Sequence, residues 1–168
     1  MTVNPSCPVV VVPCSAAKLS TTAPVPAADL YVGSFHRLCR RAAHAIASGT
    51  GTVLVLSAAH GFVTLDEPLA PYELRMGEPG SVQPDQLRAQ AELLGLHHAR
   101  QLIALGGRAY VEAVAAVRPD VLRPLVGCRG IGQQRHRLSR IAAAEQPLLL
   151  AQEFADGSSS PARPSAAR

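Results

Sequence analysis

The sequence lacks the features that mark membrane, disulfide-rich and zinc-binding proteins. No apolar run in its 168 residues approaches the roughly 20 residues that a membrane-spanning helix needs. The opening residues, "MTVNPSCP", contain none of the basic residues of a secretion signal. The four cysteines, Cys7, Cys14, Cys39 and Cys128, are spaced neither as zinc ligands nor as a compact disulfide framework. We therefore expect a cytoplasmic protein without a metal, a cofactor or a membrane contact.

Aromatic residues and lysine are also scarce. Aromatic residues make up 4% of the chain and tryptophan is absent, so the core must be built from Val, Leu, Ile and Ala. Lys18 is the one lysine among 16 basic residues, and the net charge is +4. An apolar content of 48% and this length predict one globular domain, residues 1–155. The polar residues 156–168 are expected to form a disordered tail.

Strand and helix patterns alternate along the chain. Short, apolar, β-branched runs predict buried strands at 8–12, 52–57 and 101–105, with a short fourth strand within 122–128. Amphipathic patterns predict helices at 34–48, 83–101, 108–117 and 132–145. The segments 15–29 and 58–80 are expected to be loops. This alternation predicts an α/β fold in which helices cover both faces of a parallel sheet.

Polar and glycine-containing turns follow each predicted strand. Ligands of such sheets bind beyond the carboxyl ends of the strands, where these turns meet. The residues that follow the first three strands are Cys14, Ser15, Lys18, Ser57, His60, Gly61 and Gly106. The sequence therefore predicts a ligand site at this edge of the sheet.

The strongest chemical signal in these turns is His60. A histidine directly after a buried strand is suited to act as a general acid or base, or as a hydrogen-bond donor to developing charge. Asp66 and Glu67 follow on the same predicted loop, where either could orient a water or bind a ribose hydroxyl, and Tyr72 could form a pocket wall. The alternative is that His60 is a structural residue.

The turn "PCSAAK" offers an anion site. Ser15 and the backbone N–H groups after it could cradle a phosphate or carboxylate, and Lys18 would add a point charge. We expect Cys14 to shape the pocket rather than to act as a nucleophile, since a cysteine after a strand is usually a small buried residue. Lys18 could also be catalytic and attack a carbonyl carbon if it is desolvated. The remaining alternative for Lys18 is an ordinary surface lysine.

The segment "ADLYVGSFHRLC" contains three further polar candidates. Tyr31 could stack on a planar base, and Ser34 and His36 could bind its polar edges. In the alternative interpretation Tyr31 packs the entry to the helix, Ser34 is the N-cap and His36 is exposed.

Residues 123–140 are strongly basic, with five arginines, His136 and no acidic residue. Such a run fits a phosphate-bearing partner, for which we select Arg129, Arg135 and Arg137 as contacts. The alternative is a solvated helix face. The glycines at "GCRGIG" are not spaced as in a dinucleotide-binding loop, so we reject a nicotinamide-binding fold.

Three blocks of the chain resemble a bacterial and phage family of small domains of unknown function. They are "PCSAAKL", "PAADLYVGSFHRLCRRA" and "VLSAAHGFVTLDEPLAPYELRM", and the resemblance covers roughly residues 9 to 140. It points to Cys14, Lys18, Tyr31, Ser34, Ser57, His60, Gly61 and Tyr72. The pattern is also similar to the C-terminal catalytic part of archaeosine synthase, which acts on a deazaguanine base in transfer RNA, and at greater distance to the YaaA-like proteins.

The resemblance implies a uracil-DNA-glycosylase-like fold: a three-layer α/β/α sandwich with a short, mostly parallel four-stranded sheet. The chain departs from the pattern at several positions. Leu19 and Ser20 follow Lys18 where the archaeosine pattern has proline and tyrosine, and His36 stands one place early in its register. Fold similarity alone does not establish function.

Two functions of different classes remain. The first is an enzyme that hydrolyses an N-glycosidic bond or modifies a base, acting on a nucleoside, a nucleotide or a single-stranded nucleic acid. The second is a non-catalytic nucleic-acid-binding stress or defence protein that uses the 123–140 run. With few aromatics to insert between bases, the chain favours a free or single-stranded substrate over a duplex. The oligomeric state is left open.

Overall fold

The structure is a computed structural model that describes residues 1–157. Its centre is a four-stranded sheet in the order β4-β3-β1-β6. The strands are β1 (Pro8–Pro13), β3 (Thr52–Ser57), β4 (Gly61–Thr64) and β6 (Gln101–Ala104). The mixed α/β class and the mostly parallel four-stranded sheet that we predicted are confirmed.

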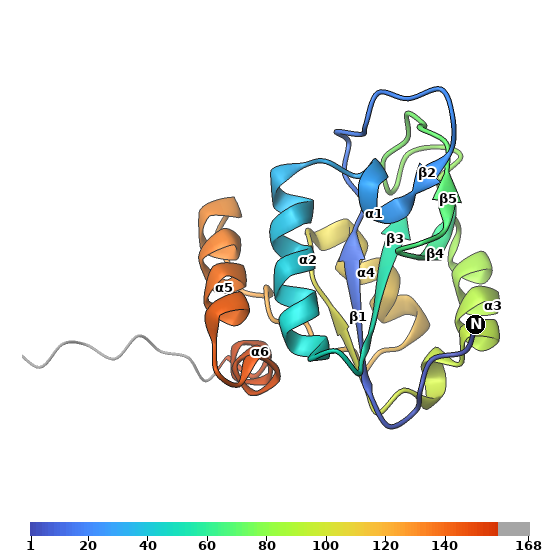
Figure 1. Cartoon of the computed structure of the whole chain (residues 1–168). Coiled ribbons are helices and arrows are strands. Elements are labelled where there is room, and N and C mark those ends of the chain that lie inside the picture. Colours follow the sequence, from blue (N-terminus) through green and yellow to red (C-terminus); the bar gives the residue numbers. More distant parts are fainter. Residues whose placement is uncertain (158–168) are drawn as a thin grey trace, which may run out of the picture.

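The three parallel strands fix the location of the site. β1 pairs in parallel with β3, with Val10 opposite Val53, and on its other side with β6, with Val10 opposite Ile103. Their carboxyl ends therefore point to the same end of the molecule. The long segments between β1 and α2 and between β4 and α3 lie at that end, at the top of Figure 1.

Helices pack on both faces of the sheet, because the strands alternate buried side chains between two cores. Val10, Val12 and Val55 belong to the core under α2 (Ser34–Ala47). Their neighbours Val9, Val11 and Leu54 belong to a second core. The helices α3 (Pro84–Leu94) and α4 (Arg108–Val117) contribute to this second core. A nearly continuous apolar run in β1 is thus explained by burial on both faces.

The remaining elements add to the edges of these two cores. α5 (Ile131–Ala143) and α6 (Pro147–Ala155) pack against α2 on the side away from the sheet (Figure 1). The short elements are β2 (Val25–Pro26), α1 (Ala27–Leu30), β5 (Pro68–Leu69) and the 3₁₀ turn η1 (Leu96–His98). β2 and β5 form a small antiparallel pair.

The predicted fourth strand was misplaced. Residues 122–128 form no strand, and their backbone pairs with the sheet at a single bridge, between Leu122 and Ile103. The fourth strand is β4, in the segment that we expected to be a loop, and it pairs antiparallel with β3. Gly61 adopts a positive φ of 74°, a conformation that glycine accepts without strain, and so allows this tight reversal.

One predicted helix end and one predicted helix cap were also wrong. The helix expected over 83–101 stops at Leu94, because Gly95 takes a left-handed conformation with φ 71°. Gly33 occupies the N-cap position of α2, so Ser34 is its first helical residue and makes no capping hydrogen bond. Of the predicted disordered tail, residues 158–168 lie outside the described part of the chain.

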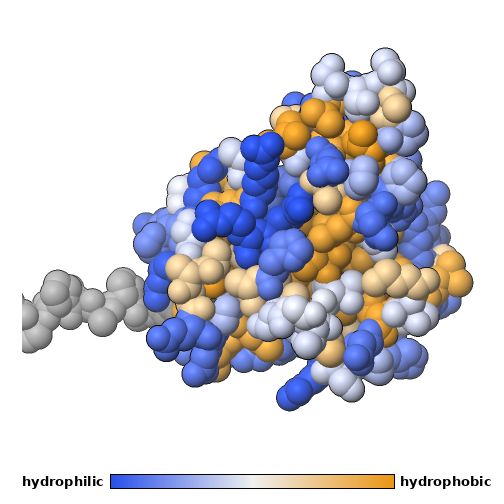
Figure 2. All heavy atoms as spheres, viewed as in Figure 1, coloured by the Kyte–Doolittle hydropathy of each residue, from blue (hydrophilic) through white to orange (hydrophobic). Residues whose placement is uncertain are grey.

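None of the helices within residues 1–157 is both long and apolar enough to cross a membrane. On the face seen in Figure 2, the most hydrophilic side chains gather over the adjoining upper parts of α2 and α5.

Candidate functional site

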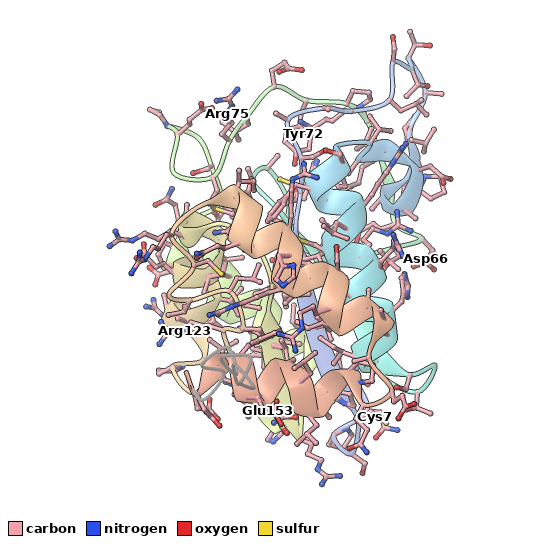
Figure 3. All side chains as sticks on the ribbon, turned by 90° about the vertical axis from the view of Figure 1, so that its left-hand side faces the viewer. Cys7, Asp66, Tyr72, Arg75, Arg123 and Glu153 are labelled. Atoms are coloured by element: carbon pink, nitrogen blue, oxygen red, sulfur yellow. The ribbon has the colours of Figure 1, made fainter. Side chains whose placement is uncertain are left out.

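All three tyrosines of the chain meet at the carboxyl ends of β1 and β3. The Tyr72 hydroxyl lies 2.8 Å from Ser57 Oγ and 3.0 Å from the Tyr31 hydroxyl. The Tyr110 hydroxyl lies 3.1 Å from Cys14 Sγ. We call these five residues the tyrosine cluster. In Figure 3, Tyr72 lies at one end of the molecule and Cys7, which precedes β1, at the opposite end.

The hydrogen bonds of Ser57 set the direction of the hydroxyl chain. The backbone N–H groups of His60 and Ala59 donate to Ser57 Oγ, at 3.0 and 3.3 Å. These donors use the two lone pairs of the oxygen, so its hydrogen points to Tyr72, which in turn donates to Tyr31. The chain of hydroxyls is therefore anchored at the turn that carries His60.

The cluster is largely buried. Ser57 and Tyr31 are 0% and 1% exposed, Cys14 is buried, and Tyr72 and Tyr110 are half-buried. Burial raises the pKa of all three tyrosines, and the nearby Cys14 raises each further. The three phenols therefore stay protonated at neutral pH and can serve as hydrogen-bond donors.

Lys18 and His60 flank Tyr72 where the cluster opens to solvent. Lys18 Nζ lies 4.3 Å from the centre of the Tyr72 ring, within the range of a cation–π contact. The His60 ring meets Tyr72 edge-on, with 5.4 Å between ring centres, and His60 is exposed. A cation, an aromatic face and an imidazole thus lie together at the opening, which suits a planar ligand that carries negative charge.

The turn after β1 is held against the start of α2. Ser15 Oγ accepts a hydrogen bond from the Gly33 N–H at 3.2 Å and donates to the Ala17 carbonyl at 2.5 Å. Backbone pairing of Lys18 with Tyr31 brings the lysine to the cluster. The Ser15 hydroxyl therefore shapes this turn rather than pointing freely to a ligand.

Gln90 on α3 fixes the turn that carries His60. Its side-chain amide donates to the His60 carbonyl at 2.7 Å and accepts from the Phe62 N–H at 2.9 Å. A Cβ at Gly61 would lie 2.0 Å from the Gln90 Oε1 atom and would displace this amide, and the positive φ of Gly61 also disfavours any other residue. Gly61 is thus needed for the geometry of the turn.

His36 is buried next to the cluster. It is therefore not exposed, as one alternative predicted, and its ring does not reach solvent to bind the polar edge of a base. Its Nδ1 lies 2.6 Å from the Pro13 carbonyl, which can only accept, so Nδ1 carries the proton. Burial lowers the pKa of His36 to about 4, with Arg40 and Arg37 adding to the effect and the Pro13 carbonyl opposing it. Its ring packs 5.4 Å from that of Tyr31. His36 is therefore a buried residue that packs against the cluster.

The structure does not bring Asp66, one of the two predicted carboxylates, to His60. Because β4 runs antiparallel to β3, it carries the chain back toward the start of β3, where Asp66 lies beside Gly51 and Thr52. Figure 3 shows Asp66 well away from Tyr72. Glu67 is exposed, but its charge contributes to the raised pKa of Tyr31. Treating 58–80 as one loop hid this separation.

The predicted phosphate contacts have different surroundings. Arg137 donates to the carbonyls of Pro124 and Val126 and stacks over Phe154, so it has a structural role. Arg135 donates to Ser34 Oγ at 2.8 Å and so joins α5 to α2. The Arg129 guanidinium is exposed, and within residues 1–157 it makes no hydrogen bond or ion pair.

Three roles were missed or misjudged from the sequence. Tyr110 joins the cluster from the first turn of α4, directly after β6, a position where the strand-end rule could have found it. Gln90 carries no signal of its own, since its partners are 28 and 30 residues away. Gly106 serves packing, because a Cβ there would lie 2.9 Å from the Pro13 side chain.

The described residues offer hydrogen-bond donors rather than metal ligands. Over residues 1–157, no three His, Cys, Asp or Glu side chains gather closely enough to hold a metal ion. The four cysteines are free, and burial strongly raises the pKa of Cys39. The chemistry of the tyrosine cluster would be carried by neutral hydroxyls, a thiol, Lys18 and His60.

Comparisons with known proteins show which family the chain belongs to. The chain is 29% identical over 148 residues to the uncharacterized protein YfjM of Bacillus subtilis (strain 168), which covers 82% of this chain and 97% of that protein. No solved structure matches the chain. The model of a family of unknown function (DUF6884) matches residues 9–140, which span β1 to α5 and contain the whole tyrosine cluster. The chain therefore belongs to this family of unknown function, DUF6884.

Proposed function

We propose that the chain is a nucleobase- or nucleoside-processing enzyme, which hydrolyses an N-glycosidic bond or modifies a base at the tyrosine cluster. The observation that carries this proposal is that Lys18, Tyr72 and His60 lie together beside a buried network of hydrogen-bonded hydroxyl groups. The aromatic face of Tyr72 would bind a nucleobase by stacking, and the Lys18 cation would bind the phosphate attached to the sugar of a nucleotide.

In the hydrolysis, a water oxygen bonds to C1′ of the sugar as the bond from C1′ to the base nitrogen breaks. The bonding electrons leave with the base, which takes a proton from the protonated His60 ring; the water loses a proton to solvent, and His60 regains one from solvent. Tyr72, rather than the buried Tyr31, supplies the ring that contacts the base. Of the two predicted carboxylates we favour Glu67 to orient the water, because its negative charge contributes to the raised pKa of Tyr31 in the cluster.

The proposal extends to the fold. We infer a three-layer α/β/α sandwich of the uracil-DNA-glycosylase-like class, supported by α2 on one face of the sheet and α3 and α4 on the other. α5 and α6, which pack outside α2, would be additions to that plan.

A panel of nucleosides, nucleotides and short single-stranded oligonucleotides, scored by mass spectrometry for released or altered base, tests the activity. His60→Ala should reduce the rate about 10²-fold or more, the usual contribution of a general acid or base. Lys18→Met should be impaired more than Lys18→Arg, which keeps the charge. The matched control is His97→Ala, an exposed histidine in η1 at the other end of the sheet. Equal rates for His60→Ala and the wild type would overturn the proposal.

The second candidate is a nucleic-acid-binding protein without turnover. The lack of acidic residues over α2 and α5 favours it. An inactive protein that still binds single strands would support this second function.

A further inference from the structure

The surface formed by α2 and α5 carries arginines without acidic partners. Residues 32–65 and 121–144, which include both helices, contain no Asp or Glu. Arg37 and Arg41 are exposed, and nowhere in residues 1–157 do they form an ion pair. They lie four residues apart and therefore on the same face of α2. Like charges at this spacing destabilise a helix, so α2 retains them at a cost in stability.

A third arginine extends this surface to the neighbouring helix. Arg135 of α5 donates a hydrogen bond to Ser34 at the start of α2, which places its guanidinium at the junction of the two helices. We call Arg37, Arg41 and Arg135 the arginine strip. A shallow groove of about 250 Å³ runs along its α2 side, lined by Arg37, Arg40, Arg41 and His44. Figure 2 shows strongly hydrophilic surface over these parts of α2 and α5.

The arginine strip leads to the opening of the tyrosine cluster. Ser34, which Arg135 contacts, follows Gly33, and the Gly33 N–H donates to Ser15 in the turn between Cys14 and Lys18. A ligand that follows the strip to the start of α2 therefore arrives beside Lys18 and Tyr72. Two hydrogen bonds, from Arg135 to Ser34 and from Gly33 to Ser15, thus connect the strip to the turn that carries Lys18.

We infer that the arginine strip is a track for the phosphates of a single-stranded nucleic acid whose base enters the tyrosine cluster. This inference rests on the proposed function and narrows its substrate from a free nucleotide to a polymer. Arg37 and Arg41 are about 6 Å apart along the axis of α2, and Arg135 lies at the start of that helix, so the strip offers positions for more than one phosphate. Arginine binds phosphate in a planar, two-point fashion.

A single strand fits better than a duplex. A base in a duplex must be unstacked and flipped out, at a cost of a few kcal/mol, and apolar side chains often fill its place. The chain has no tryptophan, and its three tyrosines are committed to the cluster. The chain therefore lacks an aromatic side chain to take the place of a base flipped out of a duplex. A single strand needs no such side chain and can still bind the strip through its phosphates.

The test is fluorescence anisotropy of labelled oligonucleotides of 2 to 20 nucleotides, about the range of known single-strand site sizes, titrated with the full chain at several salt concentrations. For Arg37→Gln/Arg41→Gln, the slope of log affinity against log salt should fall by about 1.4, since each lost phosphate contact on a single strand contributes about 0.7. Arg37→Lys/Arg41→Lys should keep most of the wild-type slope. The matched control, Arg88→Gln/Arg100→Gln, removes the same charge from exposed positions elsewhere and should keep it entirely.

Equal losses in the test and control variants would overturn the inference, because they would show an effect of net charge alone. Tighter binding of a duplex with the same number of phosphates, or equal binding of polyglutamate or of vesicles of anionic lipid, would also overturn it. Binding needs no turnover, so the two proposals can fail separately. A wild-type protein that releases base from nucleosides but does not bind single strands would refute the track and leave the enzyme. A protein that binds single strands through the arginine strip but releases no base would support the track and refute the enzyme.

Discussion

The tyrosine cluster and the arginine strip lie next to each other but are built in opposite ways. The cluster is buried, and its hydroxyls and thiol are paired with one another. Arg37 and Arg41 in the strip are exposed, and within the described chain no acid pairs with them. The polar contacts of the cluster stabilise the fold, whereas the repulsion between Arg37 and Arg41 in the strip destabilises α2.

This difference separates two kinds of recognition. A buried hydrogen-bond network holds a fixed geometry, because leaving one member unpaired costs free energy. An exposed row of arginines specifies charge and depends on salt, and it becomes favourable when a partner brings phosphates. Substitutions should therefore affect the stability of the two regions differently.

The largest effect on stability is expected from His36, which supports the cluster from below. The pKa of His36 is about 4 in the folded chain and about 6.5 when unfolded, so the unfolded chain binds more protons between these values. Stability is complete above pH 6.5 and falls as the pH drops toward 4, by about 3 kcal/mol from this group. Denaturant unfolding across this range should show the loss in the wild type and not in His36→Gln.

The exposed His97 provides the control for this pH dependence. His97→Gln should keep the wild-type profile, since His97 is exposed and has no buried surroundings that folding would impose on it. A His36→Gln variant that follows the wild-type profile would show that this buried ring does not set the pH dependence.

A smaller loss is expected from Tyr72→Phe. The change removes the hydroxyl between Ser57 and Tyr31 and leaves the buried Tyr31 hydroxyl without this partner, at a cost of about 1–3 kcal/mol. Tyr110→Phe removes one contact with Cys14 and should cost less, because sulfur is a weak hydrogen-bonding partner. A change below about 0.5 kcal/mol for Tyr72→Phe in thermal or denaturant unfolding would mean that the network does not support the fold.

How far the sequence predicted each region follows from the range of the interactions involved. The strands 52–57 and 101–105 were found because their apolar runs are local. The turns that carry Cys14, Lys18 and His60 followed from the strand-end rule. β4 was missed because its pairing with β3 depends on the tight turn at Gly61. Gln90 and Asp66 could not be placed, since their surroundings are set by segments remote in sequence or by that missed strand.

The smallest effect on stability is expected in the arginine strip. Arg37→Gln/Arg41→Gln should leave stability unchanged or raise it by about 0.2–0.5 kcal/mol, because it relieves a like-charge pair on α2. Thermal unfolding at low salt measures this most clearly, since salt screens the repulsion. Destabilisation above about 1 kcal/mol would mean that these arginines hold the fold together, and the comparison between the two regions would fail.

The central claim is that the tyrosine cluster receives a nucleobase, and ring-labelled ¹³C tyrosine NMR tests it most directly. The chain has three tyrosines, all in the cluster, so the labelled spectrum reports on this site alone. Titration with nucleosides and a short single strand should shift the Tyr72 signal, assigned with Tyr72→Phe, while ribose 5-phosphate alone should shift it much less. A spectrum in which no base-containing ligand moves any of the three signals would contradict the account.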